Sequence, residues 1–188
     1  MSKTLNPSEE ARLTARLINP DTRRAAFTEM VGIYQEQLYW QIRKLLISHD
    51  DTADVLQNTF LKAWTNLDNF RGEAKISTWL YSIAHNESIT FLQKRQAEQE
   101  MTQSDPEGFL MDQLQADKYF DGDETQRTLL KAIATLPAKQ RQVFNMRYFD
   151  DMPYEEISAI LNTSVGALKA SYHFAAEKVA AYFHKNEV

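Results

Sequence analysis

Apolar residues recur at helical spacing through the first half of the chain, and no stretch there alternates with the period of a strand. The pattern predicts a long helix from 22 to about 48, a second from about 50 to 67 and a third that begins near 76. The core positions we expect on these helices are Ala26, Phe27, Met30, Val31, Tyr34, Leu38, Ile42, Leu45 and Leu46, then Leu56, Phe60, Ala63, Trp64 and Leu67, then Ile76, Trp79, Leu80, Ile83, Ala84 and Phe91.

Three segments follow from this pattern: a first domain at 1–95, a linker at 96–124 and a second domain at 125–188. Residues 1–19 predict a short or frayed helix that ends at Asn19-Pro20, with Asp21 placed to cap the next helix. Periodicity fades in 96–124 and acidic residues dominate, which is typical of a linker. The apolar residues at 109–114 leave open a short helix that settles on a partner.

The second domain shows the pattern of a helix–turn–helix. A helix with Leu129, Leu130, Ile133 and Leu136 stops at Pro137, and a second continues through Val143, Phe144, Met146 and Arg147. The next helix spans 154–161 and buries Ile157 and Leu161, while Asn162 suits a sharp turn in the left-handed conformation. Ser164 is the expected N-cap of the last helix, on which Val165, Leu168 and Tyr172 face inward. A simple helical hairpin is the alternative for this pattern.

Charge and composition narrow the possible functions. The chain of 188 residues has no cysteine, so disulfides, thiolate metal sites and cysteine nucleophiles are excluded. No apolar run has the length of a signal peptide or a membrane span, so we expect a cytoplasmic protein without membrane insertion. The net charge of −5 divides into +1 for 1–19, 0 for 20–95, −8 for 96–126 and +2 for 127–188. The two domains are thus neutral to slightly basic, which is a weak electrostatic attraction for DNA. If DNA is bound, part of the affinity must therefore come from a partner.

A polar face on the second helix is the first candidate site. Asp54, Gln57, Asn58 and Leu61 share one side of that helix, and a leucine gains little from a face that only needs to be solvated. One interpretation is a docking face for a helix of another protein, with Leu61 supplying the buried area. The other is scatter, because single exposed apolar residues are common.

The loop 68–75 and the start of the third helix form the second candidate site. Phe70, Arg71 and Lys75 lie in the loop, and a helical face beyond it carries Ser77, Thr78, Tyr81, His85 and Ser88. Rings that stack and cations that meet phosphates suit unstacked single-stranded bases. An ordinary polar face, with Phe70 and Trp79 structural, is the alternative. The cluster His49-Asp50-Asp51 is better explained as a turn and helix cap than as an acid–base or metal site.

The residues of both halves resemble a known family. DVLQNTFLKAW followed by NFRGEAKISTWLYSIAHN looks like the second conserved region of sigma-70-type initiation factors of the extracytoplasmic-function group, and LPAKQRQVFNMRYFDDMPYEEIS matches their fourth region. The resemblance implies an all-α fold with two small helical domains, a three- or four-helix region 2 and a helix–turn–helix region 4. It implies a factor that binds core RNA polymerase through the clamp and flap of its large subunits and opens promoter DNA, without cofactor, metal or catalysis.

The resemblance also assigns residues. It implies core polymerase binding by Asp54, Gln57, Asn58 and Leu61, and capture of the −10 strand by Phe70, Arg71, Lys75, Ser77, Thr78, Tyr81, His85 and Asn86. For the −35 duplex it implies Arg147, Tyr154, Glu155, Ser164, Ala167, Lys169, Ala170 and His173.

Two departures affect the promoter sequence that we expect. The recognition helix lacks the arginines usual in this group, so bidentate readout of guanine is not available from it, and we expect recognition through shape, thymine methyls and phosphates. His85 and Gln93 stand where basic residues are frequent.

Three other classes of protein are alternatives. A sigma mimic would sequester an anti-sigma protein without touching DNA, and core polymerase binding separates it from a true factor. An ordinary helix–turn–helix regulator is disfavoured because it would not need the docking face that contains Asp54. An enzyme is disfavoured because the sequence shows no nucleophile, metal cluster or phosphate loop. The group is typically held by an anti-sigma partner, and we expect a monomer when no partner is bound.

Overall fold

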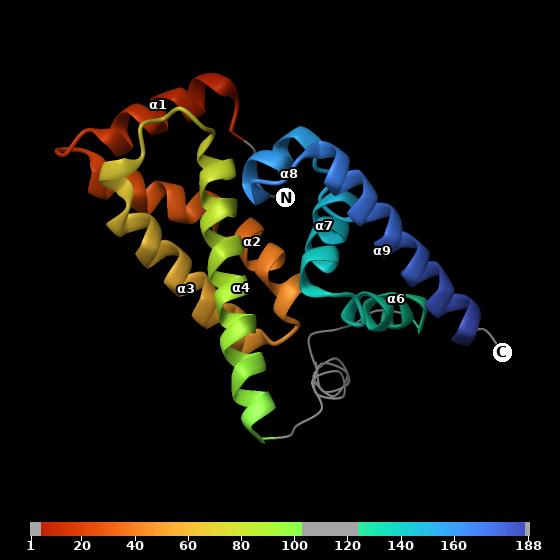
Figure 1. The fold of residues 1–188 in the computed structure, drawn as a ribbon. Coiled ribbons are helices and arrows are strands. Elements are labelled where there is room, and N and C mark those ends of the chain that lie inside the picture. Colours follow the sequence, from red (N-terminus) through yellow and green to blue (C-terminus); the bar gives the residue numbers. More distant parts are fainter. Residues whose placement is uncertain (1–4, 103–123, 187–188) are drawn as a thin grey trace.

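The computed structural model describes residues 5–102 and 124–186, and both parts are helical (Figure 1). Within these ranges no residue lies in a strand. The elements are α1 (Pro7–Ile18), α2 (Arg23–Leu46), α3 (His49–Thr65), the 3₁₀ turn η1 (Leu67–Asn69), α4 (Ile76–Thr102), α6 (Glu124–Ala134), α7 (Ala138–Tyr148), α8 (Tyr154–Leu161) and α9 (Val165–Asn186). The all-α class predicted from the hydrophobic pattern is confirmed.

The first domain packs α1 to α4 around one core. Its fully buried side chains include Leu17, Met30, Leu38, Ile42, Ile76 and Leu80, which lie on the predicted faces of α2 and α4 or on α1. Figure 1 shows α1 crossing one end of this bundle, above the loop that joins η1 to α4. The core therefore orders the first helix, which the sequence presents as short or frayed.

The second domain packs α6, α7 and α8 against the long helix α9. One apolar cluster joins α6, α7 and α9 through Ile133, Phe144 and Ala175, and another joins α7, α8 and α9 through Met146, Ile157 and Leu168. Asn162 has φ 48° and ψ 45°, so the left-handed turn between α8 and α9 is confirmed. The hydroxyl of Ser164 accepts from the Ala167 N–H at 3.4 Å, as expected for an N-cap.

Several local predictions are wrong. Trp64, predicted in the core, is 41% exposed, and its ring meets the partly buried Phe27 ring edge to face. Thr22, not Asp21, precedes α2, and it makes no capping hydrogen bond with its side chain. Ile160 is buried on α8, whereas Leu161 is only partly buried.

The linker prediction is tested only at its ends. Helix α4 continues to Thr102, past residue 95, and α6 begins at Glu124. The short helix left open at 109–114 lies outside the described residues.

Candidate polymerase and nucleic-acid interfaces

One side of α3 is free of any role in the fold. Asp54, Gln57, Asn58 and Leu61 are all exposed, and Leu61 presents 56% of its surface to solvent. No hydrogen bond or ion pair holds the side chains of Asp54, Gln57 or Asn58 among the described residues. The helical spacing therefore predicted the exposure of this face correctly.

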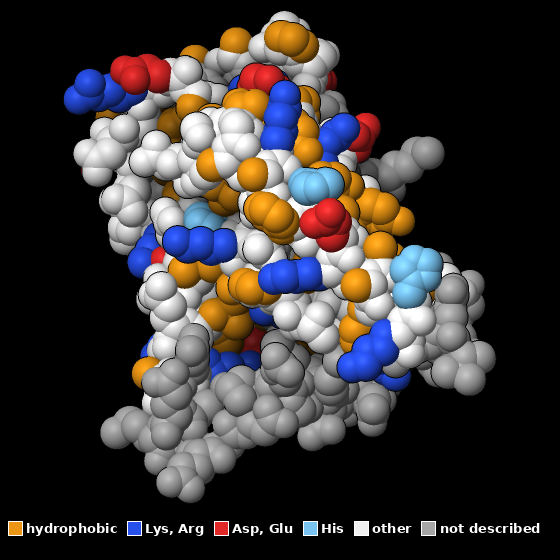
Figure 2. Space-filling view, turned by 45° about the vertical axis from the view of Figure 1, so that its right-hand side comes forward, with side chains coloured by type: hydrophobic (Ala, Val, Ile, Leu, Met, Phe, Trp, Pro, Cys, Tyr) orange, Lys and Arg blue, Asp and Glu red, His pale blue; other side chains and the backbone are white. Residues whose placement is uncertain are grey.

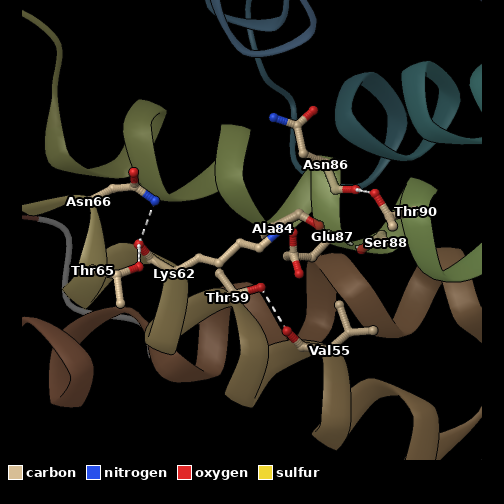
Figure 3. Close-up of polar contacts among 10 residues, drawn as sticks. All are labelled: Val55, Thr59, Lys62, Thr65, Asn66, Ala84, Asn86, Glu87, Ser88 and Thr90. Atoms are coloured by element: carbon tan, nitrogen blue, oxygen red, sulfur yellow. Dashed lines mark hydrogen bonds and ion pairs between the residues drawn. The ribbon is translucent and has the colours of Figure 1, made fainter. Parts of the chain in front are cut away.

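The opposite side of α3 is buried by short side chains. Thr52, Val55, Thr59 and Ala63 are almost inaccessible. The hydroxyl of Thr59 donates to the Val55 carbonyl at 2.8 Å, and that of Thr52 donates to the Ser48 carbonyl at 2.6 Å, so both hydroxyls are satisfied inside the core. Figure 3 shows this bond running along α3 from Thr59 to Val55. Sequence reasoning overlooked these threonines because it ranks them as polar.

The loop between η1 and α4 presents charge, while its aromatic residue points inward. Arg71 and Lys75 are exposed, as a phosphate contact requires. Phe70 is only 6% exposed and stacks on Trp79, with ring centroids 4.5 Å apart. The stacking surface predicted for Phe70 is therefore taken by Trp79, and the ring supports the loop from the core side. The signal for this was the Trp79 position on the apolar face of α4.

The face of α4 beyond the loop is partly covered. Ser77 and Thr78 are half-buried and Asn86 is exposed. In Figure 3 the Asn86 amide points away from α3. Ser88 is buried, and its hydroxyl donates to the Ala84 carbonyl at 2.7 Å, so it belongs to the interior and not to the polar face.

Tyr81 and His85 lie against the second domain. Tyr81 packs on the apolar cluster of α7, α8 and α9, and burial, followed by the charges of Asp150 and Glu156, raises its pKa to about 12. Burial, followed by the nearby Lys139 charge, lowers the pKa of His85, while the adjacent Gln142 side chain opposes that shift. Two residues predicted to meet the −10 strand are thus covered by the domain predicted to meet the −35 duplex.

Polar groups join the two domains, and we call this surface the interdomain contact. Lys44 on α2 pairs with Asp150, and the Asn145 amide on α7 donates to the Lys44 carbonyl at 3.0 Å. Helix α4 packs on α8 and α2 packs on α7 along the same side of the bundle (Figure 1). Gln41, His85 and Gln142 also line a small cavity of about 10 Å³ between the domains.

The interdomain contact leaves several polar atoms without partners. Among the described residues, Gln41 Oε1, His85 Nδ1, Gln142 Oε1 and Asn145 Oδ1 are buried and have no hydrogen-bond partner. Each such atom costs on the order of 1–3 kcal/mol relative to solvent. Separation of the domains would expose these atoms to water.

The helix–turn–helix brings a cation and an aromatic ring together. The Arg147 guanidinium carbon lies 5.6 Å from the Tyr154 ring centroid, and Lys169 Nζ lies 5.7 Å from the same centroid. Arg147 also pairs with Asp151 at 2.6 Å, and exposed Glu155 adjoins Tyr154 in the first turn of α8. Three predicted −35 residues from α7, α8 and α9 thus form one cluster.

The exposed face of α9 is small and mixed in chemistry. Ala167, Lys169, Ala170 and His173 are exposed, and His173 lies 3.3 Å from Glu177. Figure 2 shows the Lys and Arg side chains as separate groups among neutral and apolar surface on the face that it draws. No continuous basic patch appears on that face.

The part of the chain that the structure describes contains no group of three or more His, Cys, Asp or Glu side chains placed to hold a metal ion. His49 Nδ1 lies 2.7 Å from the Tyr39 hydroxyl and Asp51 pairs with Arg95, so two of the three residues of the His49-Asp50-Asp51 cluster have structural partners. No helix in the described ranges has the length and apolar character of a membrane span.

Comparison with known proteins follows the same division of the chain. Residues 30–98 match the family model "Sigma-70 region 2", and residues 126–179 match "Sigma-70, region 4". A solved complex of CnrH with the cytosolic domain of CnrY has the same fold, with a TM-score of 0.70 and 21% identity over 95% of this chain and 99% of that one.

Curated relatives place the chain in one group of this family. It is 33% identical to the ECF RNA polymerase sigma factor SigW of Bacillus subtilis over 156 aligned residues, and the alignment covers 79% of this chain and 83% of that relative. It is 29% identical over 183 residues to the RNA polymerase sigma-H factor of Pseudomonas aeruginosa, covering 93% and 94%. The chain therefore belongs to the sigma-70 family, in its extracytoplasmic-function group, and is a transcription initiation factor.

Proposed function

We propose that the two domains divide promoter recognition between them. The exposed face of α3 docks on core RNA polymerase, the loop 70–75 with the first three turns of α4 captures the −10 strand, and the helix–turn–helix contacts the −35 duplex. The proposal includes no catalytic step and places the protein in the cytoplasm, where RNA polymerase acts. Strand opening is driven by binding of unstacked bases.

The main support for docking on core polymerase is the face of α3 formed by Asp54, Gln57, Asn58 and Leu61. Its four side chains are exposed on a helix whose opposite side supplies the core, so the fold gives no reason for a leucine there. A polymerase helix laid on this face would bury Leu61 and meet the amides and carboxylate around it.

The −10 strand needs a different state of the molecule. Arg71 and Lys75 are exposed, but Tyr81 and His85 lie under the second domain. Capture of bases on Tyr81 therefore requires α7 and α8 to leave α4. The partnerless polar atoms at the interdomain contact support such a separation, because water satisfies them in the open state.

For the −35 element the site consists of Arg147, Tyr154 and Lys169, with Glu155, Ala167, Ala170 and His173 around them. The cations and the Tyr154 hydroxyl suit phosphate contacts, and the alanines suit thymine methyl groups. Ser164 caps α9, so its hydroxyl serves the helix first. Phe70 acts as support for the loop and not as a base contact.

An anti-sigma protein is a further proposed partner. Two solved structures with this fold are complexes: CnrH with the cytosolic domain of CnrY, and the sigma factor RpoE with the anti-sigma factor NepR from Bartonella quintana. A sigma mimic would bind such a protein and not core polymerase.

Titration of core polymerase with labelled protein, followed by run-off transcription, tests the proposal. Asp54→Ala with Gln57→Ala should weaken core binding by about tenfold or more. Gln35→Ala with Glu36→Ala removes the same chemistry from exposed positions of α2 and is the matched control. Unchanged affinity of the α3 variant would refute the docking face, and absence of any core binding would favour the sigma mimic.

A further inference from the structure

Helix α1 reaches over the loop that carries Arg71 and Lys75. Gly72 in that loop has φ 72°, and a Cβ on it would lie 2.7 Å from Thr14 Cγ2 and 3.5 Å from Ile18 Cδ1. Helix and loop are thus in close contact at a position where only glycine avoids both strain and collision. Residues from both line an open recess of about 500 Å³.

A side chain of α1 also caps α4. Glu10 Oε1 accepts from the backbone N–H of Ile76 at 2.8 Å, and Ile76 is the first residue of α4. The first N–H groups of a helix have no partner within it, and a carboxylate there also meets the positive end of the helix dipole. The side chains of the two preceding residues, Ala74 and Lys75, carry no oxygen that could accept this bond. The cap comes instead from 66 residues upstream.

Glu10 is held in place independently of α4. Leu13 and Leu17 bury α1 in the core, and Asn6 with Glu9 forms a capping box at its start. Glu10 also lies close to the buried Tyr34, whose pKa is raised to about 12 by burial and then by the Glu10 charge. The carboxylate is therefore a fixed point between α1, α2 and the start of α4.

We propose that Glu10 is a positioning residue for −10 capture. By capping α4 at Ile76, it fixes the junction between the loop with Arg71 and Lys75 and the helical turns with Ser77, Thr78 and Tyr81. This inference rests on the proposed function of the loop and of α4. Without the cap the first turn of α4 frays, so Arg71 and Lys75 are no longer held at a fixed position relative to Tyr81. The helix–turn–helix that contacts the −35 duplex is not affected.

Two measurements on the full chain separate the cap from its consequence. Amide hydrogen exchange and the ¹⁵N–¹H shift of Ile76 report the cap directly. Fluorescence of 2-aminopurine in the −10 element, recorded with core polymerase and compared with −35 duplex binding, reports opening. Glu10→Ala should expose the Ile76 amide and slow opening by about fivefold, as expected for loss of an N-cap. Duplex binding at −35 should not change.

The matched variants are Glu10→Gln and Glu9→Ala. Glu10→Gln retains an acceptor oxygen and should restore most of the Ile76 protection and of the opening rate. Glu9→Ala removes the side chain that completes the capping box of α1 and should leave the Ile76 amide protected.

Three outcomes would overturn the inference. An unchanged Ile76 amide in Glu10→Ala refutes the cap itself. An exposed amide with normal opening refutes the positioning role of Glu10 and leaves the proposed function of the loop and of α4 standing. An equal loss in Glu9→Ala shows that α1 acts only through its overall stability.

Discussion

Leu61 shows what helical spacing can reveal about a single residue. Its exposure follows from its position opposite Val55 and Thr59, and the structure confirms that it contributes nothing to the core. Its role in docking stays a prediction. Phe70 shows the reverse case, since a ring between polar and basic residues looks available to a base, and only its packing on Trp79 shows that it is buried.

Leu61→Asp should abolish most core polymerase binding and leave the melting temperature unchanged. The reason is that the side chain is exposed in the free protein but buried in the proposed complex, where an unpaired carboxylate is costly. A polymerase titration and a thermal melt check both parts. Trp40→Asp is the control, because Trp40 is also exposed, at 51%, but lies on α2. Equal losses from both variants would contradict a specific role for Leu61.

Buried hydroxyls mark the limit of residue-scale prediction. Thr59 reads as polar in the sequence, yet its hydroxyl donates to the carbonyl four residues earlier and the side chain packs as an apolar one. Nothing in the spacing of apolar residues indicates which hydroxyl finds such a partner.

At the scale of elements, caps and turns were partly readable. Asn162 was predicted in the left-handed conformation, and it lies there. The start of α1 carries an equally readable signal, because Asn6, Pro7 and Glu9 have the spacing of a capping box with proline at the first position, but the weak periodicity of 1–19 concealed it. The Glu10 cap on α4 could not be predicted, since its partners are far apart in the chain.

Asn162→Ala should destabilise the second domain by about 1 kcal/mol, because alanine tolerates the left-handed region poorly. Asn162→Gly adopts that backbone freely and should match or exceed the native stability. The side chain is exposed, so no core packing is lost in either variant. Urea denaturation followed by binding to a −35 duplex measures the effect. Equal midpoints for the two variants would contradict it.

At the scale of the whole molecule, the division into segments at 95 and 124 stays a prediction, and the interdomain contact could not be foreseen. The contact depends on side chains such as Lys44 and Asn145 that carry no periodic signal. The hydrophobic pattern of the sequence indicates which residues are buried within each domain. The polar residues that form a contact between domains cannot be told apart in the sequence from ordinary surface residues.

Asp150→Lys should open the molecule, because it sets two like charges against each other at Lys44. The charge swap Lys44→Asp with Asp150→Lys should close it again. Small-angle scattering gives the radius of gyration, and a dye pair on α3 and α9 gives the distance. Lys62→Glu is the control, because it breaks the Lys62–Glu87 pair within the first domain. An unchanged radius for Asp150→Lys would show that this pair does not hold the contact.

Acid should weaken the interdomain contact through His85. Its pKa is lowered in the contact, chiefly by burial, so the closed form binds fewer protons than the open form. The stabilisation is complete above the ordinary pKa of about 6.5 and is lost as pH falls through the lowered value. Lys139 and Gln142 face the imidazole, and Asp150 lines the same cavity. The dye-pair distance should therefore grow between pH 7.5 and pH 5, and His85→Gln should flatten that curve.

The second domain lies over Tyr81 while joined to α4 through residues 103–123. A tethered competitor has an effective concentration on the order of millimolar, which dilution of the protein does not change. The protein without polymerase should therefore bind single-stranded DNA weakly, even when few copies of the protein are present. On the proposed function, polymerase that binds both domains at once replaces this single self-association by two contacts, and the two contacts together open the molecule.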